Sequence, residues 1–406
     1  MPELRRSLPL PLVVLYGLGV TIGAGIYVLL GATAGRAGIY APVSFVVASI
    51  VMVFSAASFA ELAARFPVSA GEAAYVRAGF RSGTLSLVVG FLVISSGVVS
   101  SAAITVGSAG YLQEFVSVNE MILISLIVLA VGGISAWGIM ESVAFASLFT
   151  IVEAGALLAI VGAGFGSRPE LVLELPRLIP PLADLGIWAG ISGAGLLAFF
   201  AFIGFEDIVN LAEEVKEPER NLPWAIFLTL VIATIIYFLV TAVAVLSVPL
   251  DELAVSRAPL SLVFGYITGI SPVVITSIAI VATLNGVIIQ IIMASRVLYG
   301  LAKQGSLPLV FARIHPRTRT PLIATGTITT IVLALALLFP LEGLAEWTSR
   351  IVLVVFGLVN LSLVQLKRRA EPAPEGCITV QIWVPAAGFL TCLALLASDL
   401  VNSVVT

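Results

Sequence analysis

Charge is scarce in this chain. Only 11% of its 406 residues are charged, whereas about 25% is typical of a soluble domain. Residues 122–140 and 222–250 contain no charge at all, 60% of the chain is hydrophobic, and the mean hydropathy is +1.15. Because about 20 apolar helical residues cross the roughly 30 Å hydrocarbon core of a bilayer, such runs predict spanning helices. We expect an all-α polytopic membrane protein rather than a soluble one.

Histidine and cysteine are almost absent. One histidine (His315) and two cysteines (Cys377 and Cys392) cannot form a zinc or iron–sulfur cluster of the usual spacing. The net charge of −3 gives no basic footprint for a nucleic acid, and no GxxxxGK[ST] phosphate loop occurs. We therefore expect a lipid bilayer as the surroundings, no metal, no cofactor and no nucleic-acid partner. With His315 in a loop, we also expect no catalytic residues and no enzyme.

Apolar runs between charged or Pro/Gly-rich interruptions predict eleven spans. They cover residues 10–35, 41–64, 85–112, 121–137, 143–166, 187–211, 223–248, 272–301, 322–339, 351–366 and 378–398. Residues 258–270 are shorter and predict a loop or a partial helix. Arg5 and Arg6 before the first run resemble the start of a signal peptide, but the run continues to Gly31 and more spans follow. We expect an uncleaved first helix.

Lysine and arginine are unevenly distributed between the predicted loops. With the N-terminus placed in the cytoplasm, 15 of the 20 basic residues fall on the inside. The five on the outside are Arg36, Arg168, Arg177, Arg257 and Arg350. Positively charged short loops remain cytoplasmic. We expect an integral cell-membrane protein with a cytoplasmic N-terminus and, after eleven spans, a C-terminus outside.

Glycines interrupt the first span. Residues 17–31 read GLGVTIGAGIYVLLG, although each glycine costs a helix about 1 kcal/mol relative to alanine. The triplet at 23–25 therefore predicts a local unwinding. Close contact between helices is the alternative explanation for the glycines. Backbone groups that are freed at membrane depth persist only where they line a cavity or meet a ligand.

The sixth span carries a matching interruption. Its apolar run 198–205 is followed directly by Glu206 and Asp207. If spans one to five and six to ten are two copies, the two interruptions occupy corresponding positions, and the second copy is inserted upside down. Paired broken helices in an inverted repeat indicate the binding site of a secondary transporter. We predict repeats at 1–166 and 187–366, with an extra helix at 378–398.

Three motifs in the same order resemble those of the amino acid–polyamine–organocation (APC) superfamily. TIGAGIY at 21–27 is similar to its first-helix signature. GFE at 204–206, AEE at 212–214 and PERNLP at 218–223 are similar to its sixth-helix signature, and ASR at 294–296 with GSLP at 305–308 resembles the end of its eighth helix. The resemblance implies a LeuT-type five-plus-five fold with discontinuous helices 1 and 6. It also implies transport of amino acids or polyamines.

An amino acid presents a carboxylate and an ammonium group to its site. The half-helix after the first break offers unpaired N–H groups and a positive dipole end to the carboxylate. Matching to the family implies that the carbonyls of Thr21, Phe200 and Ile203 accept from the ammonium and that Phe200 covers the substrate, with ordinary packing as the alternative for its ring. The predicted substrate-binding residues, all in the two breaks, are Thr21, Ile22, Gly23, Ala24, Gly25, Ile26, Phe200, Ile203 and Gly204.

Two acidic residues within spans are candidates for proton or ion coupling, because a charge at membrane depth is costly and marks a functional site. Glu206 lies at the sixth-helix break, where capping of the half-helix is the alternative role. Glu153 lies in the middle of the fifth span. Some proton-coupled relatives have a lysine near this position, but this chain has an acid, so the lysine mechanism does not carry over to it. Proton binding, sodium ligation, pairing with a cationic substrate and a structural hydrogen bond are the alternatives for Glu153.

Polar residues of other spans are candidates for lining a cavity, with interhelical hydrogen bonding as the alternative. They are Ser96, Ser100, Asn285 and Asn360. Together these features predict a secondary active transporter that imports an amino acid or related amine by alternating access, coupled to protons rather than sodium. The alternatives are a transporter or exchanger of cationic amino acids or polyamines, and a sensor of the same fold that binds an amine without moving it.

Overall fold

A computed structural model describes residues 7–23, 25–67, 71–137, 143–212, 214–303, 305–374 and 377–405. Over these residues the chain is nearly all helical, which confirms the expected class. The α-helices are α1 (Leu10–Ile22), α2 (Gly25–Ala37), α3 (Ala41–Arg65), α4 (Gly71–Phe80), α5 (Gly83–Gln113), α6 (Glu120–Trp137), α7 (Val143–Ser167), α8 (Leu171–Glu174), α9 (Leu185–Phe200), α10 (Pro218–Ser247), α11 (Leu250–Val255), α12 (Pro259–Thr268), α13 (Val273–Lys303), α14 (Leu322–Leu338), α15 (Leu341–Arg368) and α16 (Trp383–Val405). Four 3₁₀ helices complete them: η1 (Gly38–Tyr40), η2 (Leu175–Leu178), η3 (Phe205–Leu211) and η4 (Leu309–Ala312).

Within the described ranges, nine helical stretches are long and apolar enough to cross a membrane, and α1, α12 and α14 are shorter apolar helices. Each of the eleven predicted spans contains helix. The first is divided into α1 and α2, and the sixth into α9 and η3. Residues 258–270, where a loop or partial helix is expected, contain α12.

The prediction that the tenth span begins at residue 351 is wrong, because α15 begins at Leu341. Arg350, the charge just before residue 351, lies inside the helix, where two carboxylates neutralise it. Its guanidinium lies 3.2 Å from Glu346 and 2.7 Å from Asp399. A charge that is paired in this way does not end a helix.

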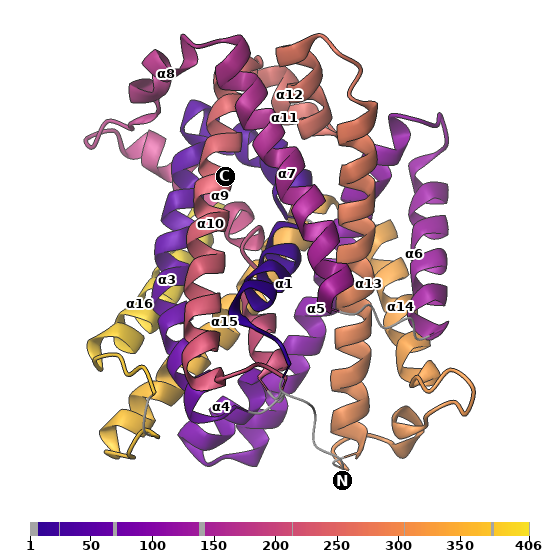
Figure 1. Cartoon of the computed structure of the whole chain (residues 1–406), viewed down its shortest axis with the longest axis vertical. Helices are drawn as coiled ribbons and strands as arrows, with labels where there is room; N and C mark the ends of the chain where they lie inside the picture. Colours follow the sequence, from indigo (N-terminus) through magenta and orange to yellow (C-terminus); the bar gives the residue numbers. More distant parts are fainter. Residues whose placement is uncertain are drawn as a thin grey trace.

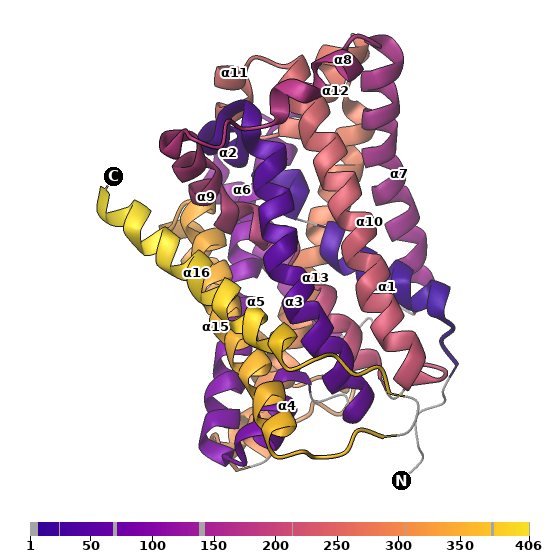
Figure 2. The ribbon, with the colours of Figure 1, turned by 90° about the vertical axis from the view of Figure 1, so that its left-hand side faces the viewer.

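The helices form one elongated bundle with two distinct ends (Figure 1). Helices α8, α11 and α12 cover one end, which we call the α12 end, and α4 lies at the other, the α4 end. Helix α16 lies along the outside of α15 and α3 (Figure 2), and α6 packs against α14 at the right-hand edge in Figure 1. The interior of the bundle is built where α5 packs along α13 and α15, α3 along α10, and α2 along α9.

A polar cap sets the start of α9 and so places its C-terminal end in the middle of the bundle. The side chain of Asp184 accepts from the backbone N–H groups of Gly186 (3.0 Å) and Ile187 (3.2 Å). A capping carboxylate satisfies N–H groups that a helix leaves free at its start. From this cap, 16 residues of helix lead inward to Phe200.

At the α4 end, a buried carboxylate joins three parts of the chain. Glu61 of α3 is fully buried and lies 2.8 Å from Arg65 and 2.8 Å from Lys367 of α15. It also accepts from the backbone N–H of Val380 at 2.7 Å, in the segment that leads to α16. Arg65 donates in turn to the carbonyl of Glu371 at 3.1 Å. This ion cluster holds α3, α15 and the start of α16 together.

Candidate functional site: two broken helices in contact

The first break separates α1 from α2. The backbone N–H of Gly23 still bonds to the carbonyl of Gly19 at 3.1 Å, and α2 begins at Gly25. Ala24, a predicted substrate-binding residue, lies outside the described residues. Gly25 and Ile26 form the first turn of α2, the position at which a helix leaves its N–H groups without intrahelical acceptors.

The second break lies between α9 and η3. Residues 201–203 continue from α9 with tight turns, in which Ile203 N–H donates to the carbonyl of Phe200 at 3.1 Å. Gly204 then has φ +123°, a conformation that is open to glycine and strained for other residues. The Glu206 carboxylate accepts from Gly204 N–H at 2.8 Å. This is the local capping bond that was the alternative role for Glu206.

The two breaks lie directly against each other. A Cβ atom built on Gly25 would be 2.3 Å from the Cα of Ala201, and one on Gly204 would be 2.9 Å from the carbonyl oxygen of Val20. Only glycine permits two backbones to come so close. The interrupted first and sixth spans therefore cross at their breaks.

Other glycines of the first span serve close helix contacts. A Cβ on Gly19 would lie 2.2 Å from the hydroxyl of Thr150, and one on Gly31 would lie 2.6 Å from the carbonyl of Leu253. Both explanations of the glycine-rich run, local unwinding and close helix contact, therefore apply, at different positions. Some glycines allow helices to approach, and the segment around Gly23 is the break itself.

Two adjoining cavities flank the breaks. The first, which we call the break cavity, and the second, which we call the acidic cavity, are both small, with a volume of about 20 Å³ each. Ser100 of α5, Ile203 and Gln290 of α13 line both. The acidic cavity extends toward the α4 end, because Glu72 of α4 contributes to its wall together with Glu206 and Asp207.

The predicted residues fall into distinct groups in the structure. The break cavity is lined by Thr21, Gly25, Ser100, Phe200 and Ile203. Ser96 and Glu206 line the acidic cavity. Four predicted residues lie in the breaks or directly beside them without lining either cavity: Ile22, Gly23, Ile26 and Gly204.

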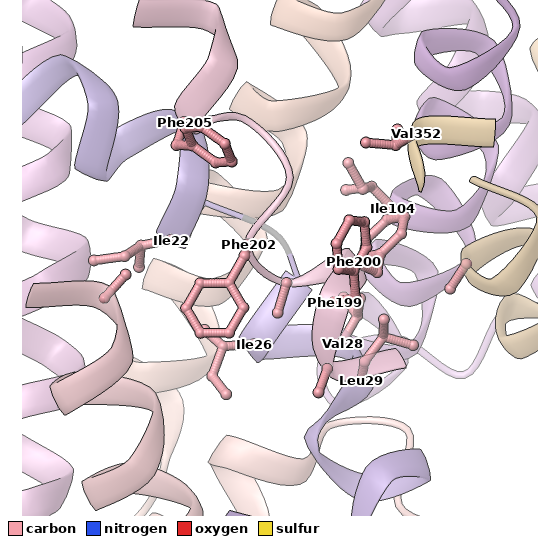
Figure 3. Close-up of a cluster of buried hydrophobic side chains, with 14 of the residues drawn as sticks. Ile22, Ile26, Val28, Leu29, Ile104, Phe199, Phe200, Phe202, Phe205 and Val352 are labelled. Carbon is pink, nitrogen blue, oxygen red and sulfur yellow. The ribbon is translucent and has the colours of Figure 1, made fainter. Parts of the chain in front are cut away.

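The phenylalanines around the second break have different roles. Phe200 lines the break cavity beside Ile104, and Figure 3 shows the two side chains next to each other. The ring of Phe199 packs 6.0 Å from that of Phe356, and the ring of Phe202 packs 5.0 Å from that of Tyr237. Phe199 and Phe202 therefore pack against other rings of the core, whereas Phe200 lines the break cavity.

Glu153 lies against the first break from the side of α7. It is buried, and its Oε2 would be 3.8 Å from a Cβ on Gly23. Tyr27, just after the break, donates its hydroxyl to the Glu153 backbone carbonyl at 2.9 Å. The carboxylate is thus next to the broken backbone, although Glu153 lines neither cavity.

The two asparagines line neither cavity. Asn360 of α15 accepts from Ser58 at 2.6 Å and donates to Ser55 at 2.9 Å, both on α3. This is the interhelical hydrogen bonding that was the alternative role. Asn285 of α13 has a buried side-chain oxygen without a hydrogen-bond partner among the described residues.

Sequence reasoning missed two residues of this region. Glu72 is on α4, outside the predicted spans, and a charged residue there is expected to be exposed. In the structure it is buried, and burial raises the pKa of its carboxyl. Tyr237 of α10 lies 2.8 Å from both the Thr21 and Ala201 carbonyls, which belong to the two breaks. The sequence feature that could have identified Tyr237 is that it is the one tyrosine in the uncharged run 222–250.

Comparison with known proteins agrees with this architecture. Residues 12–405 match the family profile described as amino acid permease. The chain belongs to the amino acid permease family. This confirms the APC resemblance of the three motifs and makes the chain an integral membrane transporter.

Three relatives illustrate the range of this family. The branched-chain amino acid permease BcaP of Bacillus subtilis is 28% identical over 97% of this permease and 88% of its own chain. The vacuolar cationic amino acid transporter 4 of Arabidopsis thaliana is 31% identical over 90% of this permease and 64% of its own chain. The methylthioribose transporter of Bacillus subtilis is 24% identical over 90% and 82%. All three are named as permeases or transporters rather than enzymes.

Proposed function

We propose that this permease is a secondary active transporter that imports an amino acid by alternating access and binds it where the two helix breaks meet. The observation that carries the proposal is the contact between the breaks, with Gly25 and Ala201 backbone to backbone beside the break cavity. Broken helices that meet at membrane depth supply free backbone groups to a ligand.

The residues that line the break cavity suit a neutral amino acid with an aliphatic side chain. The substrate carboxylate would meet the first-turn N–H groups of Gly25 and Ile26, where the helix dipole favours negative charge. Side chains of Ile104, Phe200 and Ile203 offer the substrate an apolar wall. The relative BcaP is named as a branched-chain amino acid permease, which agrees with this choice.

The two breaks also support an inverted five-plus-five repeat and an orientation. The first break follows α1 in the first predicted repeat, and the second follows α9 in the second. Arg36, at the end of α2, pairs with Glu342 and Glu346 at the start of α15, and Arg257 lies between α11 and α12. Since these arginines belong to the sparsely basic side, we place the α12 end outside and the N-terminus in the cytoplasm of the cell.

We further propose proton coupling without a cofactor, through the carboxylates at the breaks. Glu153 lies beside the first break and Glu206 caps the second. Each is therefore placed so that gain or loss of a proton alters the packing of a broken segment.

Glu153→Gln should flatten the pH dependence of uptake, because glutamine keeps the shape of the side chain and cannot exchange a proton. Initial uptake rates between pH 5 and 8 test this in proteoliposomes. The matched control is Glu174→Gln, which removes a carboxylate from a half-exposed pair with Arg177 and should leave the profile as in the parent protein. If Glu153→Gln has the parental profile, its role is structural.

A cationic substrate is the second candidate, favoured by the acidic cavity. Glu72, Glu206 and Asp207 contribute three buried carboxylates to its wall, and opposite charge nearby compensates the desolvation of a substrate ammonium or guanidinium. The Arabidopsis relative is named as a cationic amino acid transporter.

Uptake of labelled leucine and labelled arginine into proteoliposomes, under an inward proton gradient, decides between these candidates. We expect leucine uptake that a protonophore abolishes and that replacement of sodium leaves unchanged. Arginine uptake without leucine uptake would select the second candidate. Binding of either amino acid without flux under any gradient would show a sensor instead of a transporter.

A further inference from the structure

Tyr237 of α10 connects the two breaks through a single side chain. Its hydroxyl lies 2.8 Å from the carbonyl oxygen of Thr21, in the last turn of α1, and 2.8 Å from that of Ala201, just after α9. Both carbonyls belong to helix ends, which leave their last carbonyls without intrahelical donors. The phenol therefore lies within hydrogen-bond distance of one carbonyl on each side of the crossing.

The ring of Tyr237 is held firmly in place. The residue is fully buried, and its ring packs 5.7 Å from that of Phe45 and 5.0 Å from that of Phe202. Phe45 belongs to α3 and Phe202 to the second break itself. Because these neighbours fix the ring, they also fix the position of the hydroxyl, which lies between the two carbonyls.

The chemistry of the hydroxyl makes the connection dependent on both breaks. A phenol has one hydrogen to donate, and two acceptors at equal distance must share it. If either break moves away, the other carbonyl takes the whole hydrogen bond, and the departing carbonyl becomes a buried acceptor without a donor. Such a group is costly in an apolar interior, so the hydroxyl favours arrangements that keep the breaks together.

We propose that Tyr237 is a positioning residue that holds the two unwound segments in register and thereby shapes the substrate site. It acts through Thr21 and Ala201, because it lines neither the break cavity nor the acidic cavity. The register matters because Thr21 and Ile203 line the break cavity and Ala201 packs on Gly25, where the substrate carboxylate would bind. This inference rests on the proposed function for its effect on transport. The bridging of the Thr21 and Ala201 carbonyls by the Tyr237 hydroxyl, which we call the clamp, is testable without transport.

Tyr237→Phe removes the hydroxyl and keeps the ring between Phe45 and Phe202. We expect faster amide hydrogen exchange in peptides that cover both breaks, in the purified protein without substrate. For transport, we expect the KM to rise by about tenfold, the order of effect of losing a buried hydrogen bond. The maximal rate per folded molecule should stay within about twofold, because bound substrate realigns the segments.

Tyr75→Phe is the matched control. Tyr75 of α4 is also fully buried, and its hydroxyl has no hydrogen-bond partner among the described residues. Loss of that hydroxyl should leave exchange at the breaks and the KM as in the parent. Should Tyr237→Phe not fold, Phe202→Leu loosens the ring support of Tyr237 and should change both quantities in the same direction by less.

The two measurements separate this inference from the function on which it rests. Unchanged exchange at the breaks in Tyr237→Phe overturns the clamp, whatever the protein transports. Faster exchange with an unchanged KM for a transported amino acid overturns its role in positioning the substrate site. If the parent protein moves no amino acid, the proposed function fails, while faster exchange at both breaks in Tyr237→Phe alone still supports the clamp.

Discussion

Gly25→Ala should abolish amino acid uptake by this permease. The added Cβ would lie 2.3 Å from the Cα and 3.0 Å from the backbone nitrogen of Ala201. Backbone atoms cannot rotate away as the end of a flexible side chain can, so the two breaks must separate. Overpacking of this kind costs about 1–3 kcal/mol, and it displaces the N–H groups that would bind the substrate carboxylate. Uptake and substrate binding per folded molecule measure the effect.

Gly326→Ala on α14 provides the control. Nothing lies within 4 Å of a Cβ at that position, and alanine is the better helix former. We expect parental uptake and equal or slightly higher thermal stability. A Gly25→Ala protein that transports at the parental rate would show that the contact between the breaks is not required for transport.

Glu61→Gln should lower the free energy of unfolding more than any other substitution proposed for this permease. Glu61 is fully buried and faces Arg65 and Lys367, whose side chains are only 7% and 13% exposed. Removing one member of a buried ion cluster leaves the opposite charges without compensation, which typically costs about 3–5 kcal/mol. Equilibrium unfolding of the protein in detergent, with added denaturing surfactant, measures the change in the free energy of unfolding.

A half-exposed ion pair at the same end of the bundle gives the comparison. Glu371 pairs with Arg81, whose side chain is 71% exposed, and exposed pairs contribute about 0–1 kcal/mol. Glu371→Gln should therefore unfold almost as the parent does. Equal stability of the Glu61→Gln and Glu371→Gln proteins would contradict a structural role for the buried cluster.

The breaks could be predicted from the sequence because their signals are local. Repeated glycines within an apolar run mark the first break, and Glu206 and Asp207 mark the second. Both conflict with an uninterrupted helix in a membrane, whatever surrounds them. The structure accordingly ends α1 at Ile22 and α9 at Phe200.

The contacts between distant segments could not be predicted in this way. The pairing of Gly25 with Ala201, and of Tyr237 with two carbonyls, depends on how α1, α2, α9 and α10 pack together. Asn360 shows the same limit: a polar residue in a span suits both a cavity and a neighbouring helix, and its contacts with Ser55 and Ser58 appear only when α15 is packed on α3.

Substrate binding at the crossing of the two breaks is tested most directly by a cysteine in place of Ser100. Ser100 lines both cavities, and Ser100→Cys changes little in size. In a protein whose own Cys377 and Cys392 are replaced by alanine, a permeant maleimide should label this cysteine. The transported amino acid should slow the labelling in proportion to its occupancy, and labelled protein should no longer transport.

Native Cys392 supplies the internal control. It belongs to α16, is buried against Ser55 of α3, and lines neither cavity. In a protein that keeps Cys392 as its one cysteine, the same amino acid should leave the labelling rate unchanged. Protection of Ser100→Cys alone is the result that the account predicts. Full transport by protein labelled at Ser100→Cys, or labelling at this position that saturating substrate does not slow, would contradict it.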